Sequence, residues 1–437
     1  MKFFSSLVAI LLTSIITIWT SSNMNWGGDN YKCLISSDGC GYYAYLPAIF
    51  IYKDLQFSHF DKVEMSKEYF STFTTQDYRL KTENGTIDKY YVGSAILWMP
   101  FFGIAHLVAS NFGHLTDGYS YPYQVSINIA SIFYLCLGIW LLSKLLIQFG
   151  FDQKSVFWSI ILTVFGTNIF YYAVLIPSFS HILSFCSIIA FFYFINQYKA
   201  TKLLIDLILG SIILGIVFLI RPVNIIILLF VPFLFADIKE LIFRLRQISL
   251  KHYLISFLCT LLVVSIQFLI YKLQTGSWIV YSYNKETFDF LNPQLVDYLI
   301  SYRKGFFVYT PMFSLFFLVG LYSLFKENPF KGSVLFTTFL FFCYVASSWW
   351  CWWYGSSFSQ RPMIDIMFLL SILICYALKN QTKGFQNTLI GIGILLLVFN
   401  QFQIYQLRYG VILQDGMTSE LYWDAFLNVN KLLDATK

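Results

Sequence analysis

Charged residues are scarce in this 437-residue sequence. Asp, Glu, Lys and Arg together account for 12% of it, whereas 57% is hydrophobic and 20% is aromatic. Soluble domains carry about 25% charged residues, so the composition excludes an ordinary soluble protein. We expect no nucleic-acid partner, because the formal net charge of +6 largely reflects lysines and arginines that flank apolar runs.

Several cofactor and catalytic motifs are also missing. The sequence has no Walker loop, no glycine-rich dinucleotide turn and no G-x-S-x-G elbow. His59, His106 and His114 lack the helical or paired spacing that zinc ligands show. We therefore expect no cofactor, and we expect no resident metal.

Long apolar runs take the place of these features. A helix needs about 20 mostly apolar residues to cross the hydrocarbon core of a bilayer. About eleven runs come near this length, which predicts an all-α polytopic membrane protein. The runs are 3–20, 125–149, 156–176, 182–198, 203–220, 223–235, 254–273, 312–325, 334–350, 363–378 and 389–405.

Lysine and arginine set the orientation, because they concentrate in short cytoplasmic loops. A further apolar run, 91–110, determines on which side of the membrane the later loops lie. If it does not cross, the basic breaks all lie on the cytoplasmic side, so we interpret it as a re-entrant or interfacial helix. These breaks contain Lys2, Lys154, Lys199, Lys202, 239–251, Lys326, Lys331, Lys379 and Lys383.

This orientation predicts one membrane domain, 1–405, with a long external loop at 21–122 that carries interfacial or re-entrant helices. A short external tail, 406–437, follows it, and 419–433 is predicted to form an amphipathic helix at the membrane surface. The first apolar run lacks a small-x-small cleavage site before Asn23, so we expect it to remain as a span.

The rare ionisable residues then fall on the external side, where we expect them to surround one mouth of the helical bundle. One of them lies in the stretch SSDGCGYYAYLPAIF, between Cys33 and Cys40, which pair either as a disulfide or as two thiols. The candidate ring consists of Asp38, His181, Arg221, Arg303, Lys304 and Arg361.

Arg221 precedes Pro222, and a residue before proline is pushed out of the helical conformation. The sequence therefore predicts a helix break with Arg221 inside the bundle, or else an arginine that snorkels from a helix end. Arg303 and Lys304 precede Gly305, a pattern that suits a bound phosphate or anchoring to lipid headgroups.

The stretch SSWWCWWYGSSFSQRP has four tryptophans in five positions, from Trp349 to Trp353. Tryptophans are typical of a membrane-edge belt, but serines and Arg361 in the same turn also suit a sugar or isoprenoid site. His181 begins an apolar run, where a histidine acts either as a capping residue or in a functional site.

Five segments carry a resemblance: DGCGYYAYLPAIFIY, GTNIFYYAVLIPSFSH, RPVN, SYRKGFFVYTP and SSWWCWWYGSSFSQRP. Together they resemble a bacterial branch of the GT-C glycosyltransferase superfamily, which includes protein mannosyltransferases, aminoarabinose transferases and oligosaccharyltransferases. The resemblance spans nearly the whole chain. It implies a GT-C-like bundle in the bacterial inner membrane, with its active site on the external face.

The resemblance implies transfer of a sugar, with inversion, from a polyprenyl-phosphate donor to a lipid, glycan or protein acceptor. Asp38 matches the first-loop catalytic acid and is expected to be the general base. His181 lies where many members have a second acidic residue, which makes a divalent metal less expected. The candidate substrate-binding residues are Arg221, Arg303, Lys304, Arg361, Tyr42, Tyr43, Trp352 and Trp353.

Two other functions remain open from the sequence. A flippase or transporter of lipid-linked sugars would need paired broken helices and ionisable residues near the membrane midplane. The sequence shows one such break, at Arg221, and no counterpart in the other half. A scaffold without turnover is the third alternative, and the clustering of Asp38 with several cations argues against it.

Overall fold

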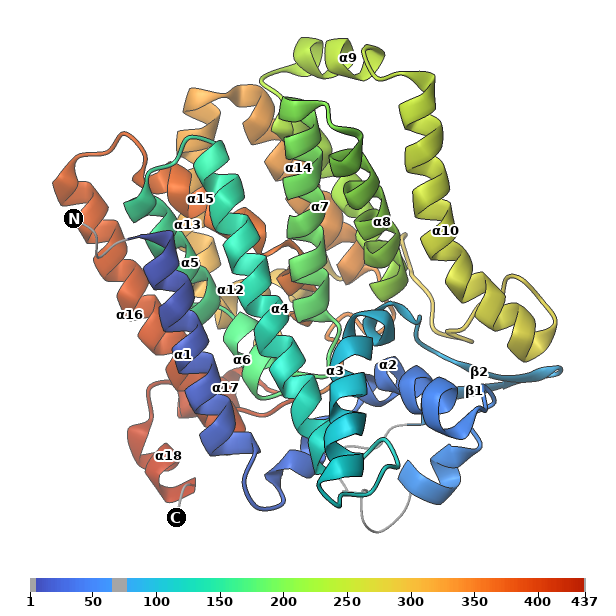
Figure 1. The fold of residues 1–437 in the computed structure, drawn as a ribbon. Helices are drawn as coiled ribbons and strands as arrows, with labels where there is room; N and C mark the ends of the chain where they lie inside the picture. The colour runs from blue at the N-terminus through green and yellow to red at the C-terminus, as the bar shows by residue number, and fades with distance from the viewer. Residues whose placement is uncertain (1–4, 65–76, 436–437) are drawn as a thin grey trace.

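The computed structural model describes residues 5–64 and 77–435, so Lys2 and the start of the first apolar run lie outside the described residues. Helices make up most of the described chain and pack as a bundle (Figure 1). The strands β1 (Arg79–Thr82) and β2 (Gly85–Asp88) form an antiparallel hairpin. This composition is that of a polytopic, mostly helical membrane protein.

Seven helices within the described ranges are long and apolar enough to cross a membrane. Shorter helices complete the bundle, and each predicted apolar run is helical for most of its length. The count of about eleven spans stays a prediction. The seven are α1 (Ser6–Asn25), α3 (Gly93–Asn111), α4 (Tyr121–Gln148), α7 (His181–Thr201), α10 (Leu250–Thr275), α14 (Pro329–Ser347) and α16 (Lys383–Arg408). The shorter helices are α5 (Gln153–Phe165), α6 (Ile169–Val174), α8 (Leu204–Ile220), η4 (Pro222–Leu234), α13 (Pro311–Glu327) and α15 (Phe368–Leu378).

The break before Pro222 is present. Helix α8 ends at Ile220, and Arg221 is extended, with φ −154° and ψ 110°. The next element, η4, is a 3₁₀ helix of 13 residues. At about 2.0 Å per residue it rises about 26 Å, against about 20 Å for an α-helix of the same length. A run that is short for an α-helical span therefore covers most of a bilayer core of about 30 Å.

One end of the bundle, called here the α2 end, carries most of the elements outside the long helices (Figure 1). At the opposite end, which α9 (Ile238–Arg246) covers, Lys199, Lys331 and Lys379 lie near Glu240 and Glu327. The elements outside the long helices include η1 (Asn30–Cys33), α2 (Asp38–Pro47), η2 (Ala48–Tyr52), η3 (Phe60–Glu64), the β-hairpin, α11 (Leu295–Ile300), α12 (Phe306–Tyr309) and η5 (Arg361–Ile366).

Helix α3, which contains the ambiguous run 91–110, packs beside the first half of α4. The Tyr134 hydroxyl donates to the Leu97 carbonyl at 2.7 Å, and the Tyr123 hydroxyl lies 2.6 Å from His106 Nδ1. The helix therefore runs antiparallel to α4 at the α2 end of the molecule. Together with α2 it forms a second hydrophobic core, separate from the larger core of the bundle.

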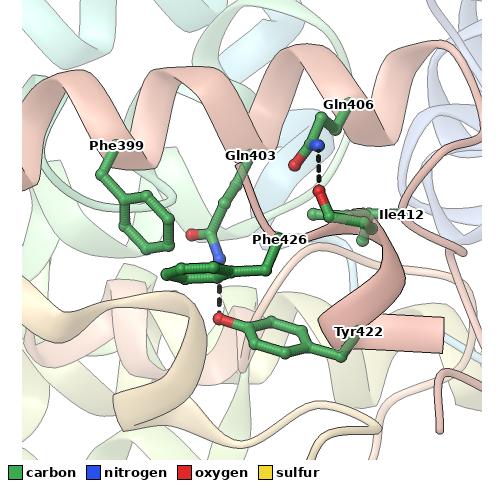
Figure 2. A pocket seen from close by; sticks show the side chains of 7 residues that line it. Phe399, Gln403, Gln406, Ile412, Tyr422 and Phe426 are labelled. Carbon is green, nitrogen blue, oxygen red and sulfur yellow. Dashed lines mark hydrogen bonds between the residues drawn. The ribbon is translucent and has the colours of Figure 1, made fainter. Parts of the chain in front are cut away.

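The C-terminal segment differs from the single amphipathic helix expected at 419–433. It forms two short helices, α17 (Ser419–Ala425) and α18 (Val429–Ala435), and Leu427 between them has a left-handed φ of 51°. Helix α17 docks on α16 (Figure 2): Gln406 Nε2 donates to the Ala425 carbonyl at 2.6 Å. The segment packs on the protein and does not form the expected surface helix, because the buried side-chain amides of Gln403 and Gln406 on α16 bind polar groups of α17.

Candidate functional site

Two glycines bring the start of α2 close to its neighbours. A Cβ on Gly39 would lie 2.1 Å from Ser178 Oγ, and one on Gly41 would lie 2.4 Å from the Tyr90 ring. No side chain fits at either position. The first turn of α2 therefore packs backbone-first against the loop between α6 and α7, and this packing fixes the position of Asp38.

Asp38 forms an ion pair with Arg361, the first residue of η5. Arg361 Nη2 lies 2.7 Å from Asp38 Oδ2, and the two side chains are 13% and 16% exposed. The guanidinium also lies over the Phe179 ring, 4.7 Å from its centroid. Burial by itself would raise the pKa of Asp38, but Arg361, a hydrogen bond with Tyr90 and the charge of Lys89 hold that pKa below its usual value. Asp38 is thus a charged carboxylate with an open edge.

Asp365, near the end of η5, forms a second ionic cluster. Its carboxylate is fully buried and accepts from both neighbours: His181 Nδ1 is 2.9 Å from Oδ1, and Arg221 Nη1 is 2.9 Å from Oδ2. The side chain of Arg221 is 16% exposed and that of His181 is 4% exposed. The short 3₁₀ helix η5 therefore supplies one residue to each cluster: Arg361 pairs with Asp38, and Asp365 pairs with His181 and Arg221.

Tyr42 and Tyr283 lie near residues of both clusters. Both tyrosines interact electrostatically with Asp38 and with Arg221. Burial, together with the charge of Asp38, raises the pKa of Tyr42 to about 12. Their hydroxyl groups are consequently protonated at neutral pH and can act as hydrogen-bond donors. Tyr283 comes from the loop after α10, which the 2.6 Å ion pair between Lys89 and Glu286 holds near the site.

Arg303 and Lys304 form a cluster of their own beside the site. Arg303 Nε lies 2.9 Å from Asp415 Oδ1, and the Lys304 ammonium donates to the carbonyls of Ser357 and Gln414. Both cations therefore tie the turn before α12 to the C-terminal segment. Burial lowers the pKa of Lys304 to about 7, although Asp415 opposes this shift. The charge of Arg361 reaches Lys304, but no direct contact joins them among the described residues.

The predicted aromatic residues lie in three different places. Tyr42 lies on the Tyr90 ring, with centroids 4.5 Å apart, and so belongs to the site. Tyr43 faces the second core, where its hydroxyl donates to the Gly118 carbonyl. Trp353 lies under Arg303, 3.8 Å from the guanidinium carbon, and Trp352 packs against Trp353. The structure brings together Asp38, His181, Arg221, Arg361 and Tyr42.

Sequence reasoning missed Asp365, Tyr90 and Tyr283. Asp365 had a readable signal, because it is a lone acid inside the predicted apolar run 363–378 and such residues are rare without a partner. Tyr90 and Tyr283 had no readable signal, since the chain contains 31 tyrosines and spacing does not distinguish these two from the others. The structure does not join Cys33 and Cys40 by a disulfide: Cys33 is exposed and Cys40 is buried in α2.

A second buried acid lies at the α2 end, in the second core. Glu64 accepts hydrogen bonds from the hydroxyls of Tyr78 and Tyr119, both at 2.7 Å, and His59 Nε2 is 3.6 Å away. Burial raises the pKa of Glu64 to about 7 despite these two bonds, and burial lowers the pKa of His59 to about 4. This cluster is separate from the Asp38 site in its contacts.

No family model and no curated protein matches the chain. Among solved structures, the oligosaccharyltransferase of Archaeoglobus fulgidus in the apo form is similar to this chain, with a TM-score of 0.48 and 12% sequence identity. The alignment covers 99% of this chain and 55% of that chain, so the chain spans about half the length of the matched structure. A likeness of this size identifies neither a family nor an activity.

Proposed function

We propose that this chain is a membrane glycosyltransferase of the GT-C type. It transfers a sugar from a polyprenyl-phosphate donor to a lipid, glycan or protein acceptor at the α2 end. The observation that carries the proposal is the partly open ion pair between Asp38 and Arg361, 2.7 Å apart, at the mouth of an apolar helical bundle. A carboxylate next to a guanidinium supplies a base for a hydroxyl and a cation for a phosphate.

The proposed transfer is a single displacement with inversion. The bond between the anomeric carbon and the phosphate oxygen breaks, and its electron pair goes to the phosphate. The acceptor oxygen bonds to the anomeric carbon and gives its proton to Asp38, the general base. Arg361 and Arg221 offset the charge that grows on the leaving phosphate.

Donor binding also solves a difficulty with Asp38 as a base. A carboxylate whose pKa is held low by Arg361 is a weak proton acceptor. A phosphate that binds Arg361 competes with Asp38 for the same guanidinium, because arginine binds both groups through paired N–H donors. Donor binding therefore loosens the ion pair and makes Asp38 more basic when the acceptor arrives.

The proposal needs no divalent metal. Asp38 already pairs with Arg361, and both oxygens of Asp365 already accept from cationic or imidazole nitrogens. It places the enzyme in the bacterial inner membrane with the α2 end outside. Its partners are the lipid-linked donor, the acceptor and the surrounding membrane lipids, with no nucleic acid.

The test begins with cells that lack the gene. Mass spectrometry of their lipid-linked sugars identifies the donor that accumulates and the product that is lost. Transfer is then measured with purified protein in lipid nanodiscs. We expect Asp38→Asn to lower turnover by at least about 100-fold, the usual contribution of a general base.

Glu83→Gln is the matched control, because Glu83 is an exposed acid on the β1–β2 turn. It should turn over like the wild type. Normal turnover in Asp38→Asn would refute the assignment of the base. If the wild-type protein moves a labelled lipid-linked sugar across vesicles and forms no product, the chain is a flippase.

A further inference from the structure

Asp365 is a buried carboxylate whose partners come from two other parts of the chain. His181 is the first residue of α7, and Arg221 lies in the break between α8 and η4. Each carboxylate oxygen accepts from one of these partners, at 2.9 Å. The side chain of Asp365 has no exposed surface, so it cannot touch a substrate. Any effect it has on a reaction must pass through His181 or Arg221.

The contact with Asp365 favours one tautomer of His181. Nδ1 faces the Asp365 carboxylate, which only accepts, and also Arg221 Nη1, which only donates and lies 3.0 Å away. Because Arg221 already donates to Asp365 Oδ2, a proton on Nδ1 gives each carboxylate oxygen its own donor. Nε2 then carries the lone pair, and no described residue donates to it. The rings of Tyr172 and Phe179 border the imidazole, with centroids 5.9 Å and 6.5 Å from it. The ring is thereby held with one acceptor nitrogen left for a ligand.

The same carboxylate fixes the direction of Arg221. An arginine in an extended break between two apolar helices has a long, mobile side chain, and both the membrane edge and the bundle interior are within its reach. The bond from Nη1 to Asp365 turns it inward, and 16% of the side chain stays exposed. The charge of Arg221 acts on Tyr42 and Tyr283, which also feel Asp38. The guanidinium therefore acts on the same two tyrosines as Asp38.

We propose that Asp365 is the positioning residue of this site. It keeps His181 in the tautomer whose Nε2 accepts a hydrogen bond from a substrate hydroxyl, and it aims Arg221 at the phosphate of the donor. This inference rests on the proposed function for the identity of the phosphate. Its physical content, a phosphate site that depends on the contact between Arg221 and Asp365, can be tested without turnover.

The first test measures binding of undecaprenyl phosphate to the full-length protein in nanodiscs. Asp365→Asn keeps the size and shape of the side chain, but it replaces one carboxylate oxygen by an NH₂ group, which cannot accept a hydrogen bond from Arg221 or His181. Arg221 then loses its fixed position. We expect affinity for undecaprenyl phosphate to fall about 10-fold or more, as for other residues that orient a ligand-binding group. Asp38→Asn should keep or improve this affinity, because it releases Arg361.

Asp88→Asn is the matched control. Asp88 is also fully buried, but among the described residues it forms no ion pair with the cations of the site, and burial raises its pKa well above the usual value. This variant should bind like the wild type. Wild-type affinity in a folded Asp365→Asn variant would overturn the proposal.

The second test separates positioning from a structural role and does not need Asp365→Asn to fold. Arg221→Lys and His181→Gln are compared singly and together, by binding of undecaprenyl phosphate and by kcat and KM for the donor. Groups held by one carboxylate act as a unit, so their effects should not add. We expect Arg221→Lys to raise KM and His181→Gln to lower kcat by about 10-fold to 100-fold. Additive effects, or unchanged binding in Arg221→Lys, would overturn the proposal.

The two proposals fail in different ways. If the protein transfers no sugar but binds undecaprenyl phosphate through Arg221 and Asp365, the glycosyltransferase proposal fails and the positioning role stands. If transfer occurs and Asp365→Asn has no effect on KM, kcat or binding, the positioning role fails and the enzyme assignment stands.

Discussion

At the scale of single residues, the partly exposed Asp38 and the buried Asp88 and Glu64 have pKa values that move in different directions. Neighbouring charges hold the pKa of Asp38 low, whereas burial raises that of Asp88 and that of Glu64. The difference follows from partners: Arg361 faces Asp38, while tyrosine hydroxyls face Glu64. Ionisation is thus favoured at Asp38 and disfavoured at Asp88 and Glu64.

Glu64 makes folding stability depend on pH. Its pKa is about 7 when folded, against 4.5 for an unperturbed glutamate. Between these values the folded state binds more protons than the unfolded state, so stability falls as pH rises from about 4.5 to about 7. We expect Glu64→Gln to remove this loss and to be more stable than wild type at pH 8, by roughly 3 kcal/mol at most. Thermal unfolding at several pH values measures the difference.

His59 acts in the opposite direction. Its pKa is lowered to about 4, so its contribution to stability is lost as pH falls below about 6.5. Because wild type and Glu64→Gln both contain His59, the difference in stability between them, followed from pH 4.5 to pH 7, isolates Glu64. Glu83→Gln, on the exposed turn, should follow the wild-type profile. A Glu64→Gln profile parallel to wild type over this range contradicts the prediction.

The site was only partly predictable at this scale. Asp38, His181, Arg221 and Arg361 were recognised because charges are rare in an apolar chain and stand out. The ion pairs between them could not be predicted, since the sequence does not show that Asp365 contacts both His181 and Arg221. Arg303 and Lys304 were expected near a phosphate, but partners in the C-terminal segment, Asp415 and Gln414, occupy them. Those partners lie more than a hundred residues away, a separation that spacing cannot bridge.

At the scale of elements, the break between α8 and η4 determines where Arg221 lies. Pro222 lacks a backbone N–H and restricts the preceding residue, so α8 cannot continue through it. Pro222→Ala allows one more helical turn, which would carry Arg221 away from Asp365. We expect turnover to fall at least about 10-fold while the protein stays folded. Turnover and monodispersity of the purified variant provide the measurement.

Pro232 supplies the matched substitution, because it lies in the same 3₁₀ helix but ten positions further on. Pro232→Ala should keep turnover close to wild type. Equal losses in the two variants would mean that the proline effect comes from η4 as a whole and not from Arg221.

The elements themselves were largely predictable. Apolar runs gave the positions of the helices because the bilayer demands length and apolarity in each span. The 3₁₀ form of η4 was not predictable, because the 13 residues show no period that separates it from an α-helix. The division of the C-terminal segment into α17 and α18 was not predictable either, since leucine, which adopts a left-handed φ at Leu427, is not a residue type that signals such a turn.

At the scale of the whole molecule, different features lie at the two ends of the bundle. The α2 end carries the site, the hairpin and the second core, whereas Lys199, Lys331 and Lys379 lie together at the α9 end (Figure 1). Positive charge concentrates on the cytoplasmic side of membrane proteins. The α2 end is accordingly expected to face outward.

Topology is tested with two engineered thiols. Glu83→Cys lies on the exposed β1–β2 turn, and Lys239→Cys lies on exposed α9. In intact spheroplasts, a membrane-impermeant maleimide should label Glu83→Cys, and Lys239→Cys should react only after permeabilisation. The unmodified protein sets the background from native cysteines. The reverse labelling pattern would invert the molecule and remove the external site.

The six-residue turn η5 supplies Arg361 to one ion pair and Asp365 to the other. A displacement of this turn moves both charges together, so the position of Arg361 at Asp38 and that of Asp365 at His181 are mechanically linked. Under the proposed function, edits to η5 are therefore expected to change donor selectivity and turnover together. The loop that carries Tyr283, which interacts electrostatically with Asp38 and Arg221, is the better place to change specificity alone.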